Sequence, residues 1–519
     1  METWLLILIT ITICFVLKPI LTQRFTKKLH ASLPPGPFII PIIGSFLWLI
    51  RNSLADLEPI LRNLHAKYGT IVTLRVGPRP AIFIRDRSLA YQALIQNGAI
   101  FADRPPALPT FKIITSNQHN ISSAFYGSTW RQLRRNLTSE ILRHSRVMHY
   151  SHSRKWVLEI LNKRLQAHST TTSSQLVCVR DHFQYAMFCL LCLMCFGDKL
   201  DEKQIKSIET VQRSILLAFG RFNIVNIFPR LTKLLLPKRW EKLWKARRDQ
   251  EQVLIPLINA RKSKKMSMQS KDDDQNDESP VSYADTLLEL ELPHENRKLK
   301  EDEIVSLCSE FLNAGTDTTS TTFEWTMANI VKYPHVQERL FEEIKAVVGD
   351  GAEDIKEEDL QGMPYLKAVI LEGLRRHPPG HFVLPHAVTE DVVLGGYLTP
   401  KNCLLNFMVA EMGLDSEVWE DPLSFKPERF LNEDGKGAET FDMACSKEIK
   451  MMPFGVGRRM CPGYGLAMLH LEYFVANMIW KFKWTADDEL GVDLVSEKLE
   501  FTMVMKNPLH ARISPRFIN

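Results

Sequence analysis

A short glycine-rich segment around one cysteine constrains this chain more than any other feature. Residues 454–463 read Phe-Gly-Val-Gly-Arg-Arg-Met-Cys-Pro-Gly, with the cysteine at position 461. The three glycines permit turns and a close backbone approach that a Cβ atom would block. The largely apolar stretch Tyr464–Ala476 predicts a helix that begins directly after the cysteine, and its N-terminal dipole would favour a thiolate. The segment therefore predicts a loop that presents Cys461 as a metal ligand.

Two interpretations of Cys461 compete. A lone cysteine in a turn is most often a buried free thiol. Here, however, a phenylalanine, two glycines, an arginine and the cysteine follow the spacing Phe-x-x-Gly-x-Arg-x-Cys-x-Gly, which is a highly specific pattern. A cysteine thiolate on haem iron pushes electron density toward oxygen and favours O–O cleavage. Backbone N–H groups of the loop would tune the sulfur, and Arg459 would supply a cation for a haem propionate.

This loop resembles the haem-binding segment of the cytochrome P-450 family, and the likeness covers nearly the whole chain. The plant microsomal members are the most similar. The resemblance implies haem b (iron protoporphyrin IX), with Cys461 as the axial metal ligand and Phe454, Gly455 and Gly463 around it. It also implies a mainly α fold with small β-sheets (α+β), a single large helical domain with an N-terminal membrane-anchor helix.

A second unusual segment lies inside a long apolar stretch that predicts a helix over Glu301–Val331. After Ala314 and Gly315, every residue of Thr316–Thr322 is Thr, Ser or Asp, which is a poor composition for a helix interior. A local rule broken in mid-helix suggests a functional reason. The alternative is a polar stripe whose threonine hydroxyls bond helix carbonyls.

The resemblance assigns roles to this segment. It implies that the helix crosses the haem face opposite the cysteine and bulges at Ala314 and Gly315, where water and oxygen fit. Thr318 and Asp317 would then be the catalytic residues that deliver protons to oxygen.

The resemblance implies that three further residues contact the haem propionates. Trp130 and Arg134 are four residues apart, so both would point the same way from one helix, although a basic helix face is the plainer explanation. Many relatives carry an arginine after a proline where this chain reads Leu384-Pro385-His386. His386 can still donate a hydrogen bond, but its charge then depends on pH.

A structural ion-pair cluster is also expected. Glu372 and Arg375 lie one turn apart on a predicted helix, and such pairs are common on protein surfaces. The resemblance implies that Arg429 joins them and that the three lock the segment carrying the haem loop. A buried bidentate pair favours arginine over lysine.

The first 45 residues differ from the rest. Residues 1–21 are apolar enough for a transmembrane signal anchor, and the positive charges that follow keep that side cytosolic. Residues 22–45 form a basic and Pro-rich linker, and residues 46–519 form the cytosolic haem-binding catalytic domain. We expect a single-pass protein of the endoplasmic reticulum membrane, in contact with membrane lipid.

Composition excludes other classes. A net charge of +5 is too small to indicate nucleic-acid binding, so no nucleic-acid partner is expected. Nine cysteines in so long a chain do not form a disulfide framework. Cys189, Cys192 and Cys195 resemble an iron–sulfur motif, but they lie in an apolar stretch that predicts a buried helix. Residues 262–280 pass from basic to acidic and predict a surface loop.

Helical patterns dominate the remainder, with short β-branched runs between them. The predicted helices are Leu54–Tyr68, Trp130–Glu140, Arg180–Cys195, Lys203–Ala218, Trp240–Ala260, Val336–Val348 and Tyr365–His377, and the predicted strands include Ile71–Val76, Ala81–Ile84, Val392–Leu394 and Phe501–Val504.

The resemblance implies a monooxygenase that inserts one atom of O2 into a lipophilic small molecule. Apolar segments, among them Phe311–Gly315 and Phe382–Leu384, are the candidate substrate contacts. No Gly-x-Gly-x-x-Gly motif follows a predicted strand, so electrons from NADPH would come through a separate partner, NADPH–cytochrome P-450 reductase. The alternatives are a reductase-independent isomerase or dehydratase, and a non-catalytic haem- or lipophile-binding protein.

Overall fold

The structure is a computed structural model, and it describes residues 32–37, 56–75, 79–171, 176–218, 225–226, 229–269, 281–292, 294–432 and 441–517. No helix within these ranges is long and apolar enough to cross a membrane. The predicted anchor, residues 1–21, lies outside the described residues, as does most of the predicted linker.

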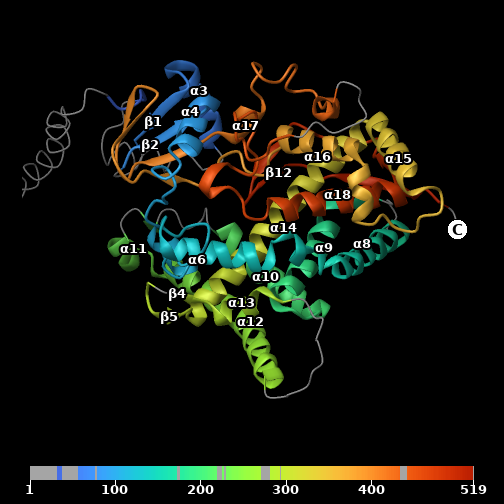
Figure 1. Cartoon of the computed structure of the whole chain (residues 1–519), viewed down its shortest axis with the longest axis horizontal. Helices are drawn as coiled ribbons and strands as arrows, with labels where there is room; N and C mark the ends of the chain where they lie inside the picture. The colour runs from blue at the N-terminus through green and yellow to red at the C-terminus, as the bar shows by residue number, and fades with distance from the viewer. Residues whose placement is uncertain are drawn as a thin grey trace, which may run out of the picture.

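A helical core built on α14 (Glu301–Lys332) makes up most of the molecule (Figure 1). Helices α9 (Val179–Phe196), α16 (Pro364–Arg376) and α18 (Tyr464–Lys481) all pack against α14. The 32 residues of α14 span about 48 Å at the usual helical rise. One continuous apolar cluster joins these four helices, so α14 is the axis of the core.

Helix α9 illustrates why the centre is helical. From Tyr185 to Phe196 every residue is apolar, and such a segment has to be covered on every side. Cys189, Cys192 and Cys195 are all buried within it. No group of metal-binding side chains was found within the described ranges. The prediction of a buried core helix is therefore confirmed.

The other helices surround this core. They are α3 (Leu57–Tyr68), α4 (Arg87–Tyr91), α5 (Pro109–Ile114), α6 (Ser128–Asn136), α7 (His144–Met148), α8 (Ser151–Thr171), α10 (Glu202–Ala218), α11 (Pro229–Leu235), α12 (Pro237–Gln269), α13 (Tyr283–Glu289), α15 (Pro334–Val348) and α17 (Val409–Gly413). Shorter helical turns cover Gln92–Gln96, Leu137–Ile141, Glu358–Gly362, Pro427–Phe430 and Gly457–Arg459.

A four-stranded sheet forms a second, smaller body beside the helices (upper left in Figure 1). Its order is β1 (Ile71–Leu74), β2 (Ala81–Ile84), β9 (Leu404–Phe407) and β6 (His386–Ala387). Strands β2 and β9 are parallel and the other pairs antiparallel. Its buried apolar residues divide between two clusters, and one of these includes residues next to the cysteine loop.

The remaining strands form small sheets. Strands β10 (Phe482–Ala486), β13 (His510–Pro515) and β3 (Leu176–Cys178) form one sheet, and three pairs complete the set: β11 (Glu497–Leu499) with β12 (Met503–Met505), β4 (Glu291–Leu292) with β5 (Arg297–Lys298), and β7 (Val392–Leu394) with β8 (Tyr397–Thr399). The predicted class, mainly α with small sheets, is confirmed.

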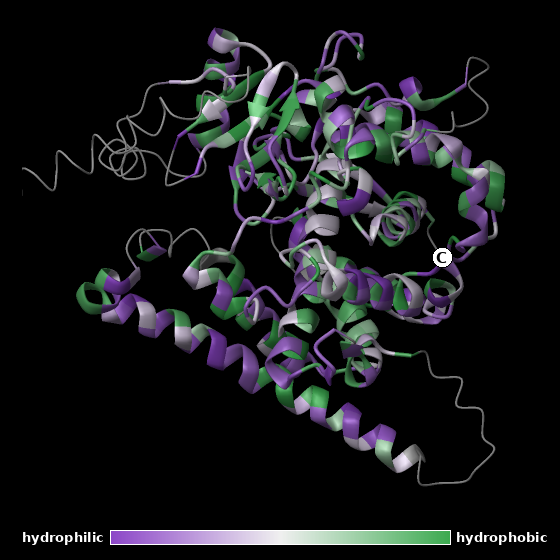
Figure 2. Cartoon of the chain, turned by 60° about the vertical axis from the view of Figure 1, so that its left-hand side comes forward, coloured by the Kyte–Doolittle hydropathy of each residue, from purple (hydrophilic) through white to green (hydrophobic). Residues whose placement is uncertain are grey.

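Several predicted boundaries differ from the structure, and two of the differences have a clear physical reason or consequence. The expected surface loop at 262–280 is helical at its start, because α12 continues to Gln269. Lysine, methionine and glutamine are good helix formers, which explains the extension. Figure 2 shows α12 along the outside of the molecule with mixed hydropathy. The helix predicted over Trp130–Glu140 divides into α6 and a π-helical turn, Leu137–Ile141.

Candidate active site

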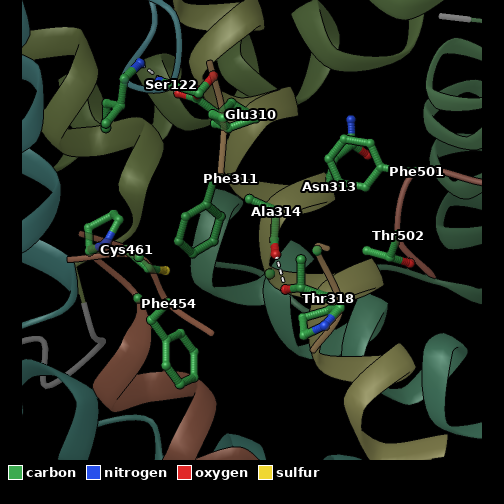
Figure 3. Close-up of a pocket in the computed structure, with 18 of the residues that line it drawn as sticks. Ser122, Glu310, Phe311, Asn313, Ala314, Thr318, Phe454, Cys461, Phe501 and Thr502 are labelled. Carbon is green, nitrogen blue, oxygen red and sulfur yellow. Dashed lines mark hydrogen bonds between the residues drawn. The ribbon is translucent and has the colours of Figure 1, made fainter. Parts of the chain in front are cut away.

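A cavity of about 1690 Å³ lies between α14, the cysteine loop and the edge of the four-stranded sheet (Figure 3). Cys461 and Phe454 line it from the loop, and Thr318 lines it from α14. Phe311 and Phe501 contribute apolar surface. The cavity thus brings together two segments that the sequence singled out independently.

The backbone of the cysteine loop needs its glycines. Gly455 and Gly457 have φ of +64° and +71°, a region that favours glycine. A Cβ atom on Gly457 would lie 2.2 Å from the carbonyl oxygen of Leu94, so no larger residue fits. The Cys461 N–H donates to the Phe454 carbonyl at 2.9 Å and closes the loop.

Burial and nearby donors shift the pKa of the Cys461 thiol in opposite directions. Burial raises the pKa of the Cys461 thiol, whereas the backbone N–H of Gly463 and the Arg134 guanidinium lower that pKa. Helix α18 begins at Tyr464, three residues later, as predicted. A bound metal ion deprotonates a coordinating thiol outright. Because Cys461 also lines the cavity, its sulfur is available there as a metal ligand.

A cationic corner adjoins the loop. The Arg459 guanidinium lies 4.3 Å from the centre of the Trp130 ring, and that of Arg134 lies 5.6 Å from it. Arg134 also donates to the Met460 carbonyl at 2.6 Å. Arg459 donates to the Ala102 carbonyl at 2.7 Å, and burial lowers its pKa to about 10.

Trp130 gives the sharpest test of what this corner binds. Its indole N–H is buried, and none of the described residues accepts a hydrogen bond from it. A buried donor without a partner is costly, so a ligand with an acceptor is expected there. The propionates of haem are such acceptors, with Arg134 and Arg459 supplying positive charge. The residues present therefore fit haem.

His386 is placed at the cavity but is neutral. Its Nδ1 lies 2.6 Å from the Phe101 carbonyl oxygen. Burial, reinforced by the Arg104 charge, lowers the pKa of His386 to about 3. The Nδ1–H is occupied by that carbonyl, and the neutral ring has no second N–H to donate.

Arg104 was not predicted, although it is the buried cation beside His386. It donates to the carbonyls of Ser122, Leu384 and Pro385 at 2.7 to 2.9 Å and lines the cavity. Burial lowers the pKa of Arg104 to about 9. Its only sequence signal is the charged pair Asp103–Arg104, which directly follows the apolar pair Phe101–Ala102.

Helix α14 approaches the cavity without the expected bulge. It continues as α-helix through Ala314 and Gly315, and the Thr318 hydroxyl donates to the Ala314 carbonyl at 2.6 Å. This is the bonding that the alternative interpretation described. A Cβ atom on Gly315 would lie 2.7 Å from a methyl carbon of Leu191, so this glycine permits close packing of α9 on α14.

Asp317 faces a different direction from Thr318. Its carboxylate accepts from Gln184 at 3.0 Å and from Arg213 at 3.2 Å, toward α9 and α10. Arg213 also pairs with Glu500 at 3.1 Å and is 30% exposed. Burial raises the pKa of Asp317, and Arg213 opposes that shift. The structure therefore places Asp317 between the core and solvent, away from the cavity wall.

The structure also brings the three expected ion-pair residues together. Arg375 makes two bonds to Glu372, at 2.7 and 2.8 Å, and both side chains are fully buried. Arg429 lies 3.3 Å from the same carboxylate. Arg375 further donates to the carbonyls of Gly413 and Pro422, which ties α16 to the chain that leads to the cysteine loop.

Polar residues on the cavity wall of α14 were also missed. Glu310 and Asn313 line the cavity beside the predicted apolar segment Phe311–Gly315 (Figure 3). Glu310 and Ala314 are four residues apart, so the helical spacing was a signal that both lie on one face of α14. Glu310 was missed because only the apolar segment beside it was considered as a substrate contact.

The cavity between α14 and the glycine-rich loop thus offers a thiol, two cations and an indole N–H that together fit a haem. The family model described as Cytochrome P450 matches residues 34–513. The chain is 51% identical to "Cytochrome P450 89A9" of Arabidopsis thaliana, over 97% of this chain and 99% of that protein. It is 29% identical to an isoflavone 2'-hydroxylase of Medicago truncatula, over 96% and 95%.

A solved zebra fish cytochrome P450 with progesterone has the same fold. The TM-score is 0.71 at 22% identity, over 89% of this chain and 99% of that chain. The chain belongs to the cytochrome P450 family and is a cytochrome P450 monooxygenase, with the haem cofactor that this family implies. The predicted family and fold are confirmed.

Proposed function

We propose that the chain uses haem b and electrons from NADPH, delivered by a separate cytochrome P450 reductase, to insert one atom of O2 into a lipophilic small molecule. The observation that carries this proposal is the shared cavity of Cys461 and Thr318. Bound haem supplies the activation of O2. The chain's own residues hold the cofactor, orient the substrate and move protons.

Each side chain then has a defined task. Cys461 binds the metal, and Trp130, Arg134 and Arg459 hold the cofactor's carboxylates. Rotation of the Thr318 hydroxyl away from the Ala314 carbonyl would turn its proton toward the cavity. Asp317, bonded to the partly exposed Arg213, would pass protons inward from solvent.

A basic surface beside the cysteine loop supports a reductase partner. Arg458 donates to the Tyr126 hydroxyl at 2.5 Å, and Arg131 lies 4.9 Å from the centre of that ring. Arg131 and the nearby Arg135 are exposed. Clustered cations of this kind steer an acidic protein toward the surface and speed the encounter.

Membrane attachment is part of the proposal. In addition to an anchor over residues 1–21, α11 exposes Leu234 (77%) and Leu235 (64%) next to Lys233. Exposed leucines beside lysine suit the interface of a bilayer. We infer a single-pass location in the endoplasmic reticulum membrane, where lipophilic substrates concentrate.

Turnover in a reconstituted system tests this function. The full-length chain, reductase and lipid vesicles are combined, and NADPH and O2 consumption are measured against a panel of lipophilic compounds. We expect at least one compound to raise both rates and to gain a single oxygen atom, labelled from ¹⁸O2. Conversion of a peroxide substrate without NADPH would indicate an isomerase or dehydratase. Binding without any turnover would indicate a carrier.

A further inference from the structure

Glu310 is a carboxylate on the wall of the active-site cavity. Between Glu310 and Ser320, the residues of α14 that keep accessible surface are Glu310, Ala314, Gly315 and Thr318. Glu310, Ala314 and Thr318 are spaced by four residues and therefore share one helix face. Glu310 lies deep in the protein and lines the cavity, so its accessible surface faces inward.

The two carboxylate oxygens of Glu310 are only partly used. One accepts from the Ile121 N–H at 2.8 Å, and the other accepts from the Ser122 N–H at 2.7 Å. The Ser122 hydroxyl is also hydrogen-bonded to this carboxylate. An ionised carboxylate has about four acceptor positions, so about one remains. No lysine or arginine of the described chain forms an ion pair with it, although the more distant Arg104 attracts its charge.

Anchoring a loop is the simpler explanation for Glu310. Burying a carboxylate is expensive, however, and two neutral N–H groups with one hydroxyl compensate for it incompletely. An additional donor that enters the cavity would complete its hydrogen bonding. We propose that Glu310 determines specificity by accepting a hydrogen bond from an N–H or O–H group of the substrate, an inference that rests on the proposed monooxygenase function.

The helix sets the distance between recognition and reaction. Glu310 is four residues from Ala314 and eight from Thr318, which is about 6 and 12 Å along the helix axis. A substrate held at Glu310 would therefore be oxidised about 6 to 12 Å from its donor group. The rest of the substrate would contact the apolar cavity wall, which includes Phe111, Phe311 and Phe501. The substrate class is a lipophilic molecule with a hydrogen-bond donor at one end.

Matched probes test this inference on the full-length, haem-loaded protein. The probes are 4-cyclohexylphenol and its methyl ether, which lacks only the donor, and binding is followed by the haem absorbance shift. We expect the phenol to bind the wild type at least about tenfold more tightly, since a hydrogen bond to a charged group has this strength. Glu310→Gln should remove most of that difference and leave the affinity for the ether within about twofold.

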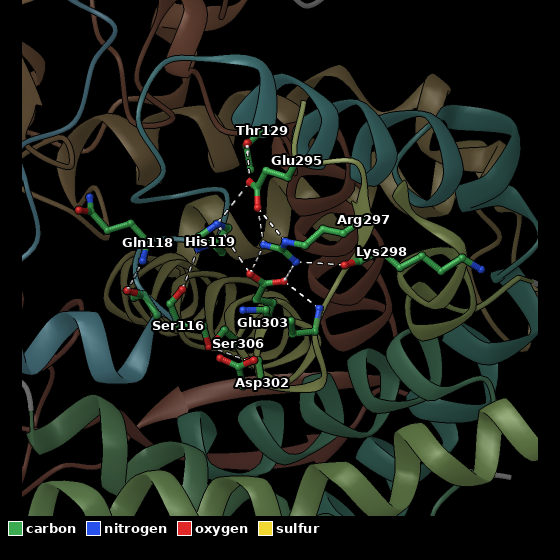
Figure 4. Close-up of polar contacts among 12 residues, drawn as sticks. Ser116, Gln118, His119, Thr129, Glu295, Arg297, Lys298, Asp302, Glu303 and Ser306 are labelled. Carbon is green, nitrogen blue, oxygen red and sulfur yellow. Dashed lines mark hydrogen bonds and ion pairs between the residues drawn. The ribbon is translucent and has the colours of Figure 1, made fainter. Parts of the chain in front are cut away.

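Ser116→Ala is the control for loop anchoring. The Ser116 hydroxyl donates to the Asp302 carbonyl at 2.7 Å and lies 2.8 Å from the Ser306 hydroxyl (Figure 4). These contacts hold to α14 the same loop that Glu310 holds through Ile121 and Ser122. Loss of the Ser116 hydroxyl should weaken both probes equally. Equal weakening by Glu310→Gln would overturn the inference, as would equal affinities for the two probes in the wild type. Failure of the proposed function itself would show separately, as a wild-type chain without a thiolate-type carbon-monoxide spectrum.

Discussion

Single residues at the cavity are specialised by what surrounds them. Trp130 and Arg134 are one helical turn apart on α6. Trp130 presents an indole N–H without a partner among the described residues, whereas Arg134 places a positive charge near the Cys461 sulfur. Thr318 and Asp317 are neighbours in the chain but face different environments, the cavity and a partly exposed ion-pair network. The chemistry of each residue follows from these contacts.

Trp130→Phe should weaken haem binding while the fold persists. The substitution keeps an aromatic ring under Arg459 and removes only the N–H proposed to bond a propionate. Transfer of haem to apomyoglobin should become about tenfold faster or more, since a hydrogen bond to a charged group is lost. Trp480→Phe is the matched control, because its N–H bonds the Ala352 carbonyl at 2.9 Å, away from the cavity. Equal haem loss in both variants would contradict this role.

Thr318→Ala should uncouple oxygen use from product formation. Its hydroxyl is the proposed proton donor at the cavity, and a positioned donor contributes at least about tenfold to a rate. NADPH oxidation should continue while hydrogen peroxide replaces most of the product, measured as the ratio of product to NADPH. Thr326→Ala, whose hydroxyl bonds the Thr322 carbonyl at 2.8 Å on the same helix, should stay coupled. Full coupling in Thr318→Ala would rule out the relay.

At the scale of elements, α16 is fixed to the segment that leads to the cysteine loop. Arg375→Lys should be strongly destabilising, because lysine cannot make both bonds to Glu372 and still reach the carbonyl of Gly413. We expect a loss of about 3 kcal/mol or more in the free energy of unfolding, measured by urea denaturation. Arg376→Lys should cost under about 1 kcal/mol, because within the described ranges only the Leu423 carbonyl accepts from the Arg376 side chain. Similar losses in both variants would refute a locking role.

Contiguous segments could be predicted from the sequence, whereas contacts between distant segments could not. The cysteine loop and the start of α18 are encoded within about 25 residues, so glycine positions and apolar periodicity were sufficient. Arg104 and Glu310 become site residues only because chain segments far apart in sequence meet at the cavity. The absent bulge in α14 has the same origin, since the role of Gly315 depends on Leu191 from α9.

The whole molecule should lose stability in mild acid. Burial lowers the pKa of His386 and His470 to about 3 and that of His377 to about 4, from an ordinary value of 6.5. Below pH 6.5 the unfolded chain binds protons that the folded chain refuses, so stability is complete above pH 6.5 and falls as the pH drops toward 3.

The contribution of one histidine can be isolated. Between pH 7 and pH 5, His386 alone should cost about 2 kcal/mol, measured by urea unfolding at both pH values. His386→Gln keeps a donor for the Phe101 carbonyl and should reduce the fall by that amount. His510→Gln, at the first residue of the central strand β13 and remote from the cavity, is the control variant. A fall that is identical in His386→Gln and the wild type would contradict the buried neutral state.

The central claim is that the Cys461 sulfur binds haem iron in the cavity below α14. The most direct measurement is the absorbance difference spectrum of the full-length protein, reduced and exposed to carbon monoxide, for the wild type and Cys461→Ser. We expect a thiolate-type band in the wild type and its complete loss in the variant, with Cys445→Ser, a buried thiol outside the cavity, unchanged. A wild type that takes up no haem, or a thiolate band that persists in Cys461→Ser, would contradict the account.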